Sequence, residues 1–161
     1  MKPELRVARM ADAEPISALF AACYPTLMAP AYAPDVLSAA LPKMIHANPV
    51  LIASGRFYVV EQEGRIIGAG GWGPAPPSGE DVPVHIRHFA THPDATGQGV
   101  GALCLTRCQE DARAEGHPAL GCFSSLNAEG FYARHGFQRV AARDIPIGDA
   151  SFPVIEMRCP L

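Results

Sequence analysis

Apolar positions along the chain recur with periods of two residues and of about 3.6 residues, which are typical of strands and helices respectively. Seven apolar or alternating runs predict strands at Leu5–Arg9, Arg56–Glu61, Arg65–Trp72, Val82–Thr91, Ala119–Ser124, Phe137–Ile145 and Val154–Cys159. With four helices between them, the order is β-α-α-β-β-β-α-β-α-β-β. This alternation predicts an α/β fold built on a mixed sheet.

The four predicted helices have recognisable start and stop signals. They cover about Asp12–Tyr24, Asp35–His46, Gly99–Glu115 and Ala128–His135. Asp12 is a suitable N-cap for the first helix, and Pro25 is expected to end it. Pro42 is expected to kink or split the second helix. Gly116 closes the third helix and Gly136 the fourth, as expected for C-terminal glycines.

Composition indicates an ordinary globular chain. Its 161 residues, 48% hydrophobic and 18% charged, suit one domain over residues 1–161. A net charge of −3 argues against a general nucleic-acid binder, although a local basic cleft is compatible with it. No apolar run approaches the roughly 20 residues of a membrane span, and no secretory leader is apparent. We therefore expect no membrane partner and a cytoplasmic location.

The five cysteines do not form a metal-binding pattern. Cys104 and Cys108 have helical i,i+4 spacing, which is compatible with a metal pair but more typical of buried apolar thiols. No CxxC pair occurs, so we expect reduced thiols and no metal.

The segment from Thr96 to Gly101, TGQGVG, follows a predicted strand and opens a predicted helix. Glycines let the backbone approach a ligand, and a helix N-terminus offers unpaired N–H groups, so this segment predicts a site for a pyrophosphate. It lacks the Lys-Ser/Thr of a Walker A loop, and its glycines have the wrong spacing for a Rossmann fingerprint. A plain strand-to-helix connector is the alternative.

Four stretches together carry a resemblance to a known family. They are Phe89–Gly101, Ser124–Phe137, Arg6–Asp12 and Arg65–Gly70. In this order they resemble the GNAT superfamily of acetyl-CoA-dependent N-acetyltransferases. The resemblance implies a three-layer α/β/α fold and transfer of the acetyl group of acetyl-CoA to a primary amine. The acceptor would be a small amine, an amino acid or a peptide N-terminus, attacking directly in a ternary complex.

The resemblance also implies which residues bind acetyl-CoA. They are Phe89, Ala90, Thr91, Thr96, Gly97, Gln98, Gly99, Val100, Gly101, Ala102, Asn127 and Tyr132. Thr96 departs from the family pattern, which has Arg or Gln there, so a charge-assisted contact is lost. Asn127 either reaches the pantetheine arm or caps the following helix. Arg134 either approaches the phosphates or lies on a solvated face.

Two residues are candidates for proton transfer. By resemblance, Tyr132 is the general acid for the leaving thiolate; a packed structural tyrosine is the alternative. A lysine-like amine has a pKa near 10.4, so presenting it neutral at pH 7 costs about 4.6 kcal/mol, and a base is useful. His85 lies where the family often places a base, and period two predicts that it shares one face with Phe89 and Thr91, with His88 opposite. A structural histidine is the alternative. The resemblance also implies a backbone N–H near Phe89 for the oxyanion.

The acceptor pocket is expected between the first two helices, the Gly73–Asp81 loop and the last hairpin. Candidate lining residues, which ordinary core packing would equally explain, are Met28, Tyr32, Phe57, Trp72 and Phe152. No acidic cluster marks a polyamine site, and the acceptor class stays open. A coenzyme A sensor without activity and a transferase of larger acyl groups are the competing functions. The oligomeric state is also open, with a homodimer as the commonest form.

Overall fold

The computed structural model describes residues 2–161 and has the predicted order of elements. The strands are β1 (Glu4–Val7), β2 (Phe57–Gln62), β3 (Arg65–Pro74), β4 (Val84–Thr91), β5 (Ala119–Ser124), β6 (Gln138–Ile147) and β7 (Ala150–Pro160). The helices are α1 (Ala13–Met28), α2 (Pro34–Met44), α3 (Pro49–Ala53), α4 (Val100–Ala114) and α5 (Glu129–Ala133), with 3-10 turns η1 (Met10–Asp12) and η2 (Pro93–Ala95). The α/β fold is confirmed; α3 is an addition.

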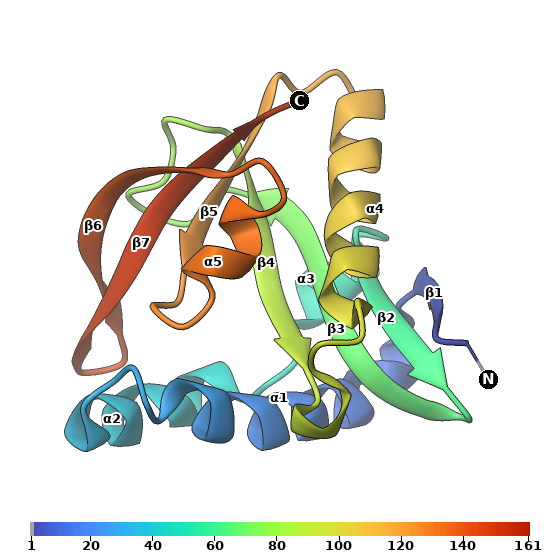
Figure 1. The fold of residues 1–161 in the computed structure, drawn as a ribbon, viewed down its shortest axis with the longest axis horizontal. Coiled ribbons are helices and arrows are strands. Elements are labelled where there is room, and N and C mark those ends of the chain that lie inside the picture. Colours follow the sequence, from blue (N-terminus) through green and yellow to red (C-terminus); the bar gives the residue numbers. More distant parts are fainter. Residues whose placement is uncertain (1) are drawn as a thin grey trace.

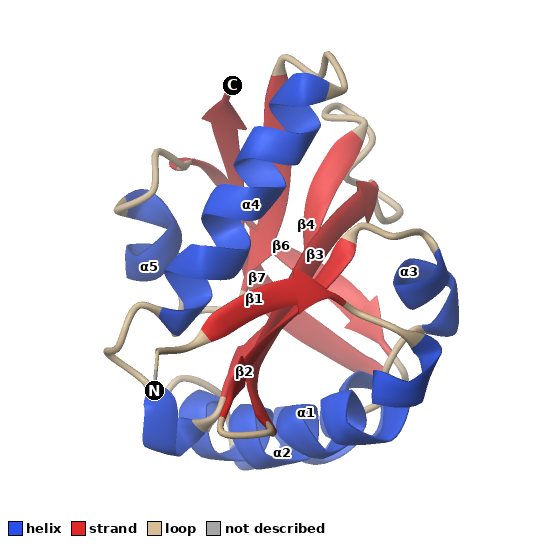
Figure 2. Ribbon diagram, turned by 90° about the vertical axis from the view of Figure 1, so that its right-hand side faces the viewer, coloured by secondary structure: helices blue, strands red, loops and turns tan. Residues whose placement is uncertain are grey.

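The seven strands form one mixed sheet in the order β1-β2-β3-β4-β5-β7-β6. Only the β4–β5 pair is parallel, and all other neighbours are antiparallel. Figures 1 and 2 show α4 and α5 on one face, with α1 and α2 across the opposite side of the sheet. The three layers match the predicted α/β/α arrangement.

Each face of the sheet has its own core, and β2 shows how its sequence supplies both. Tyr58 and Val60 are buried in the cluster beneath α4. Phe57 and Val59 are buried in the cluster that contains α1 and α2. Because successive strand residues point to opposite faces, a continuously apolar strand is buried on both sides.

Pro25 does not end α1, contrary to the prediction, and Pro42, which was expected to kink or split α2, does not split it. Helix α1 continues through Pro25 to Met28, and α2 contains Pro42. An internal proline costs about 3 kcal/mol because one backbone hydrogen bond is lost. Fully burying a large apolar side chain contributes about 1.5–3 kcal/mol, so burial of the last turn of α1, including Met28, offsets much of that cost.

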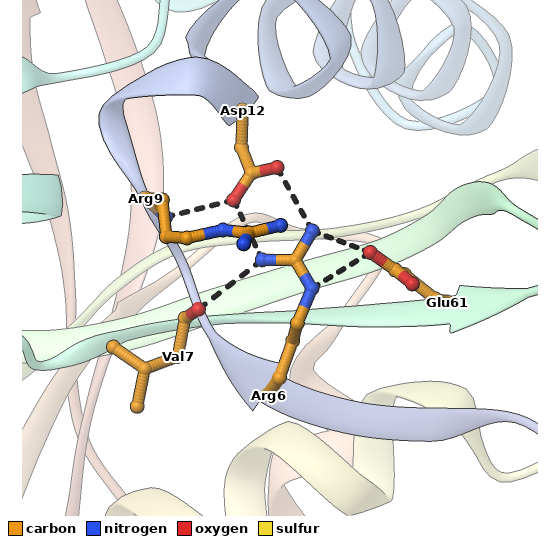
Figure 3. Close-up of polar contacts among 5 residues, drawn as sticks. All are labelled: Arg6, Val7, Arg9, Asp12 and Glu61. Atoms are coloured by element: carbon orange, nitrogen blue, oxygen red, sulfur yellow. Dashed lines mark hydrogen bonds and ion pairs between the residues drawn. The ribbon is translucent and has the colours of Figure 1, made fainter.

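Asp12 ties the N-terminal strand to the first helix (Figure 3). Its carboxylate accepts a hydrogen bond from the Arg9 backbone N–H at 2.7 Å and two from Arg6 at 2.8 and 2.9 Å. Arg6 also donates to Glu61 on β2 at 2.7 Å. The hydrogen bond from Arg6 is the main reason why the pKa of buried Asp12 lies below its usual value. Asp12, the predicted N-cap of α1, thus bonds the Arg9 backbone just before the 3-10 turn η1. Together with Arg6 it connects β1, η1 and β2.

All five cysteines are free and buried, as predicted for Cys104 and Cys108. Within residues 2–161, no helix is both long and apolar enough to cross a membrane. The same residues contain no group of three or more His, Cys, Asp or Glu side chains placed to hold a metal ion.

Candidate functional site

A cavity of about 730 Å³ lies beside β4, where β4 and β5 separate. These strands pair at one ladder position, His85 opposite Gly121. The wall contains residues of α1, α2, β4, α4, α5, β6 and β7, so segments far apart in sequence meet here. A strand separation of this kind leaves backbone groups of the inner edges without a neighbouring strand.

The inner edge of β4 is covered in part by α1. The Tyr24 hydroxyl donates to the Phe89 carbonyl oxygen at 3.0 Å. A hydrogen bond with the Thr91 backbone lowers the pKa of the Cys23 thiol, although burial has the larger effect and raises it overall. Both α1 residues line the cavity. The backbone predicted to bind the pantetheine arm therefore faces the cavity, next to side chains that the sequence analysis had not selected.

The glycine turn also lines the cavity. Gly97 and Gly99 have φ of 77° and 79°, the left-handed region that favours glycine, and Gly99 directly precedes α4. The first N–H groups of a helix have no partner within the helix, so they are free for an anion. Six of the predicted residues line the cavity here: Thr96, Gly97, Gly99, Val100, Gly101 and Ala102. Gln98, also predicted to bind the cofactor, does not.

Thr96 donates its hydroxyl proton to the Pro93 carbonyl oxygen at 3.2 Å. The hydroxyl proton of Thr96 is thus used within the turn. Arg134, at the end of α5, lines the same cavity.

Tyr132 lies on α5 inside an aromatic cluster. Its ring centroid is 6.1 Å from Phe89, 5.1 Å from Phe131 and 5.5 Å from Phe137. The side chain is buried and lines the cavity. Burial raises the pKa of its phenol well above the usual value, and a hydrogen bond with Cys122 adds to the shift. Tyr132 therefore holds its proton at every ordinary pH.

Asn127 also lines the cavity. The N-cap of α5 is Ala128, and no side chain caps this helix. The interpretation of Asn127 as a helix cap is therefore wrong, and its amide stays available to a ligand.

The prediction that His85 shares a face with Phe89 and Thr91 is wrong, because β4 contains a bulge. His88 has φ of 57°, and between Ala69 and Gly71 on β3 the register shifts by one extra residue of β4. The extra residue reverses the alternation beyond it. His88 consequently contacts Phe20 of α1, with 5.9 Å between ring centroids, while Phe89 packs against the core beneath α4.

His85 is buried outside the cavity wall. Its Nε2 lies 2.9 Å from the Gly79 carbonyl oxygen, and its ring packs against Gly121 and Phe123. Its Nδ1 has no hydrogen-bond partner. Burial lowers the pKa of this imidazole. The predicted base thus joins β4 to the Gly79 loop and does not line the cavity.

His88 lines the cavity beside α1, and His135 lines it beside α5. Burial, with a smaller contribution from the charge of Arg87, lowers the pKa of His88 to about 4. The ring is therefore neutral at pH 7 and free to accept a proton. The sequence could not select it, since nothing in its neighbours signals the bulge.

Another part of the cavity wall is made by α1, α2 and the β6–β7 hairpin. Met28 and Phe152, both predicted, line it. Tyr32 stacks on Phe152 from behind at 4.4 Å and donates its hydroxyl proton to the Pro153 carbonyl oxygen at 2.7 Å. Phe57 and Trp72 belong to the core and not to the wall.

A family model of the acetyltransferase (GNAT) domain matches residues 53–139. The search of curated proteins found no match. A GCN5-related N-acetyltransferase from Rhodopseudomonas palustris has a similar fold, with a TM-score of 0.83 and 24% identity over 100% of this chain and 97% of that chain. The PaiA N-acetyltransferase of Thermoplasma acidophilum, solved with coenzyme A, gives a TM-score of 0.77 and 14% identity over 100% of both chains. The polyamine N-acetyltransferase of Drosophila melanogaster gives 0.71 and 16%, over 99% and 100%.

Proposed function

Because the chain belongs to the GNAT family of acetyltransferases, and is therefore an acyltransferase that uses acetyl-CoA, we propose that it acetylates a primary amine by direct attack in a ternary complex. The amine belongs to a small molecule, an amino acid or a peptide N-terminus. One observation carries the proposal: a single cavity is lined by the glycine turn, by Tyr132 and by apolar side chains of α1, α2, β6 and β7, which form the proposed acceptor end. The similar fold of a Drosophila enzyme that forms N-acetylagmatine supports a small amine.

The residues present fit coenzyme A, which supplies the thioester. The start of α4 offers backbone N–H groups to the pyrophosphate. Arg134 supplies the cation that Thr96 does not, and no Asp or Glu of the described chain lines the cavity to repel the phosphates. The inner edge of β4 from Phe89 to Thr91 offers its backbone to the pantetheine arm in the manner of an added strand, with the Asn127 amide beside it. Gln98 stays outside this proposed set.

The reaction forms one N–C bond and breaks one C–S bond. The amine nitrogen attacks the thioester carbon, a backbone N–H near Phe89 meets the negative charge that develops on the oxygen, and the sulfur leaves with the bonding electrons. Tyr132 donates its proton to that sulfur. An apolar surrounding raises the proton affinity of a thiolate, so the transfer from a high-pKa phenol is matched to its acceptor.

The proton lost by the amine needs an acceptor, and His88 takes the role first assigned to His85. Its neutral ring lies on the cavity wall. A base with a pKa of about 4 is too weak to deprotonate a free ammonium. It accepts the proton once the nitrogen has bonded to carbon and become acidic, and the free amine is drawn neutral from solution. The rate should therefore rise with pH until the acceptor amine itself is neutral.

The whole of residues 1–161 acts as one catalytic domain in this proposal. The cavity combines elements from α1 to β7, so neither core of the sheet supplies a complete site. Five free thiols fit a reducing compartment such as the cytoplasm.

Thermal unfolding with and without acetyl-CoA tests the cofactor, and release of free thiol on addition of amines tests the transfer. We expect a higher melting temperature at saturating acetyl-CoA, because a ligand that binds only the native state stabilises it. An unchanged melting temperature would overturn the proposal. A shift without thiol release for any amine would favour a sensor of coenzyme A over an enzyme.

A further inference from the structure

The acceptor end of the cavity differs in chemistry from the rest of the wall. Its side chains are almost all apolar: Leu27, Met28, Met44, Ile145, Ile147 and Phe152. Among the described residues, Lys43 is the only charged side chain that α1, α2, β6 and β7 contribute to the wall. An acceptor that enters here meets hydrocarbon on most sides and one positive charge.

The β6–β7 turn holds Lys43 beside this end. A side chain at Gly148 would contact the Ala39 carbonyl oxygen and the Lys43 Cγ, both at 3.4 Å, so the turn lies directly on α2. Lys43 makes no ion pair with any described residue. The acidic side chains of the hairpin near it, Asp144 and Asp149, are exposed and do not line the cavity. The Lys43 ammonium is therefore available to an acceptor.

A second positive charge on the acceptor would find no partner in this pocket. Placing an unpaired ammonium against apolar side chains costs desolvation energy, and the like charge of Lys43 adds to the cost. An alkyl or aryl group has no such desolvation cost, and its burial against apolar side chains is favourable. A carboxylate at the far end of the acceptor would be attracted to Lys43.

We propose that the acceptor is a primary amine with an apolar body and no second positive charge, and that Lys43 extends this selection by attracting a carboxylate on the acceptor. This inference rests on the proposed function and specifies its substrate class. Polyamines and agmatine-like amines are thereby excluded as preferred substrates. Lys43 determines specificity and does not touch the reacting atoms.

Three acceptors with the same six-carbon chain test the selection. The sixth carbon is a methyl group in hexylamine, a carboxylate in 6-aminohexanoate and the carrier of an ammonium in 1,6-diaminohexane, so their kcat/KM values compare these three groups. We expect the diamine to be at least about tenfold poorer than hexylamine, after division by two for its two reactive ends. A diamine equal to or better than hexylamine would overturn the proposal.

Variants of Lys43 separate its charge from the apolar wall. Lys43→Met should lower the ratio of kcat/KM for 6-aminohexanoate to kcat/KM for hexylamine about threefold, since an exposed charge contributes little. Lys43→Glu should reverse the order of the carboxylate and the diamine. Lys2→Glu makes the same change in net charge outside the cavity, and is the matched control. Equal ratios in wild type and Lys43→Glu would remove Lys43 from the proposal.

Calorimetric titration of the free protein with the three N-acetylated products gives a readout besides turnover, and the same order of affinities is expected. If acetyl-CoA raises the melting temperature but none of the three amines releases thiol, the substrate class is wrong. If acetyl-CoA does not raise the melting temperature, the proposed function itself is wrong. The two failures are thus distinguishable.

Discussion

The two ends of the cavity are built from different parts of the chain. The part proposed to bind coenzyme A, the cofactor end, is mostly backbone: a glycine turn, the first residues of α4 and the inner edge of β4. The part proposed to bind the amine, the acceptor end, consists of side chains from α1, α2, β6 and β7. A backbone site depends on local conformation, which adjacent residues determine. A side-chain site depends on how distant elements pack, so the same fold can present different acceptor pockets behind one cofactor site.

Tyr132 lines the same cavity, and its substitution gives the largest expected effect. Tyr132→Phe should lower kcat about 100-fold, the range for loss of a general acid, and leave the affinity for acetyl-CoA within twofold. Steady-state rates and calorimetry measure the two quantities. Tyr58→Phe removes a buried phenol that bonds Asp111 outside the cavity, and is the control. A kcat for Tyr132→Phe within twofold of wild type would contradict the assignment.

His88 makes the side of the cavity next to α1 sensitive to acid. The pKa of His88 is about 4 in the folded protein, below its ordinary 6.5, so the fold favours the neutral ring. This stability is complete above pH 6.5 and is lost as pH falls from 6.5 toward 4. Between pH 7.5 and pH 5 the loss should be about 2 kcal/mol.

Urea unfolding of wild type and His88→Leu at both pH values measures that loss. The variant should lose about 2 kcal/mol less than wild type, because only wild type has to keep His88 neutral. His85→Leu is a comparison, since burial lowers the pKa of that ring too, but it lies outside the cavity wall. Equal losses in wild type and His88→Leu would show that His88 titrates normally.

A change to the glycine turn should affect only the cofactor end. Gly99→Ala forces a side chain into the left-handed region and costs about 1–2 kcal/mol, so the affinity for acetyl-CoA should fall about fivefold or more. No atom lies within 4 Å of the added methyl group, so the cost is purely one of backbone conformation. At Gly73 the φ angle is not in the left-handed region, and an added Cβ would lie 3.5 Å from the Leu51 Cδ1, an ordinary contact. The Gly73→Ala variant should therefore bind acetyl-CoA normally and is the control. Unchanged affinity of Gly99→Ala would place the anion elsewhere.

Restoring the cation at Thr96 should have the smallest effect. Thr96→Arg returns the charge that the family pattern has at this position, and an exposed pair of charges contributes about 0.2–1 kcal/mol. The affinity for acetyl-CoA should rise up to about fivefold at low salt, less at high salt. Thr106→Arg adds the same charge to α4 outside the cavity wall, as a control. No gain would mean that Arg134 already neutralises the phosphates.

Local signals were enough for most elements and for the cofactor end. The predicted strand Ala119–Ser124 has the bounds of β5, and the TGQGVG segment turns into α4 as expected. Helix α3 was missed although it has a signal: Asn48 caps it by accepting from Val50 and Leu51, with Pro49 at the first helical position. A closer search for caps would have found it.

The remaining errors come from tertiary context. Pro25 was expected to end α1, but burial of the residues beyond it keeps the helix intact. The face of His85 was mispredicted because the bulge at His88 depends on how β4 pairs with β3, and β4 itself contains no glycine or proline to mark it. Tyr24 was not selected because a phenol in an apolar helix stripe looks like core until its hydroxyl is seen to meet Phe89.

Strands β4 and β5 pair at one position only, so the sheet consists of two antiparallel parts, β1–β4 and β5–β7. The spacing between these two parts depends on the single pair formed by His85 and Gly121. A pantetheine arm that binds between them would take the place of a missing strand and hold the two parts together. Slower amide hydrogen exchange along the inner edge of β4, from Phe89 to Thr91, would then report occupancy of the site directly.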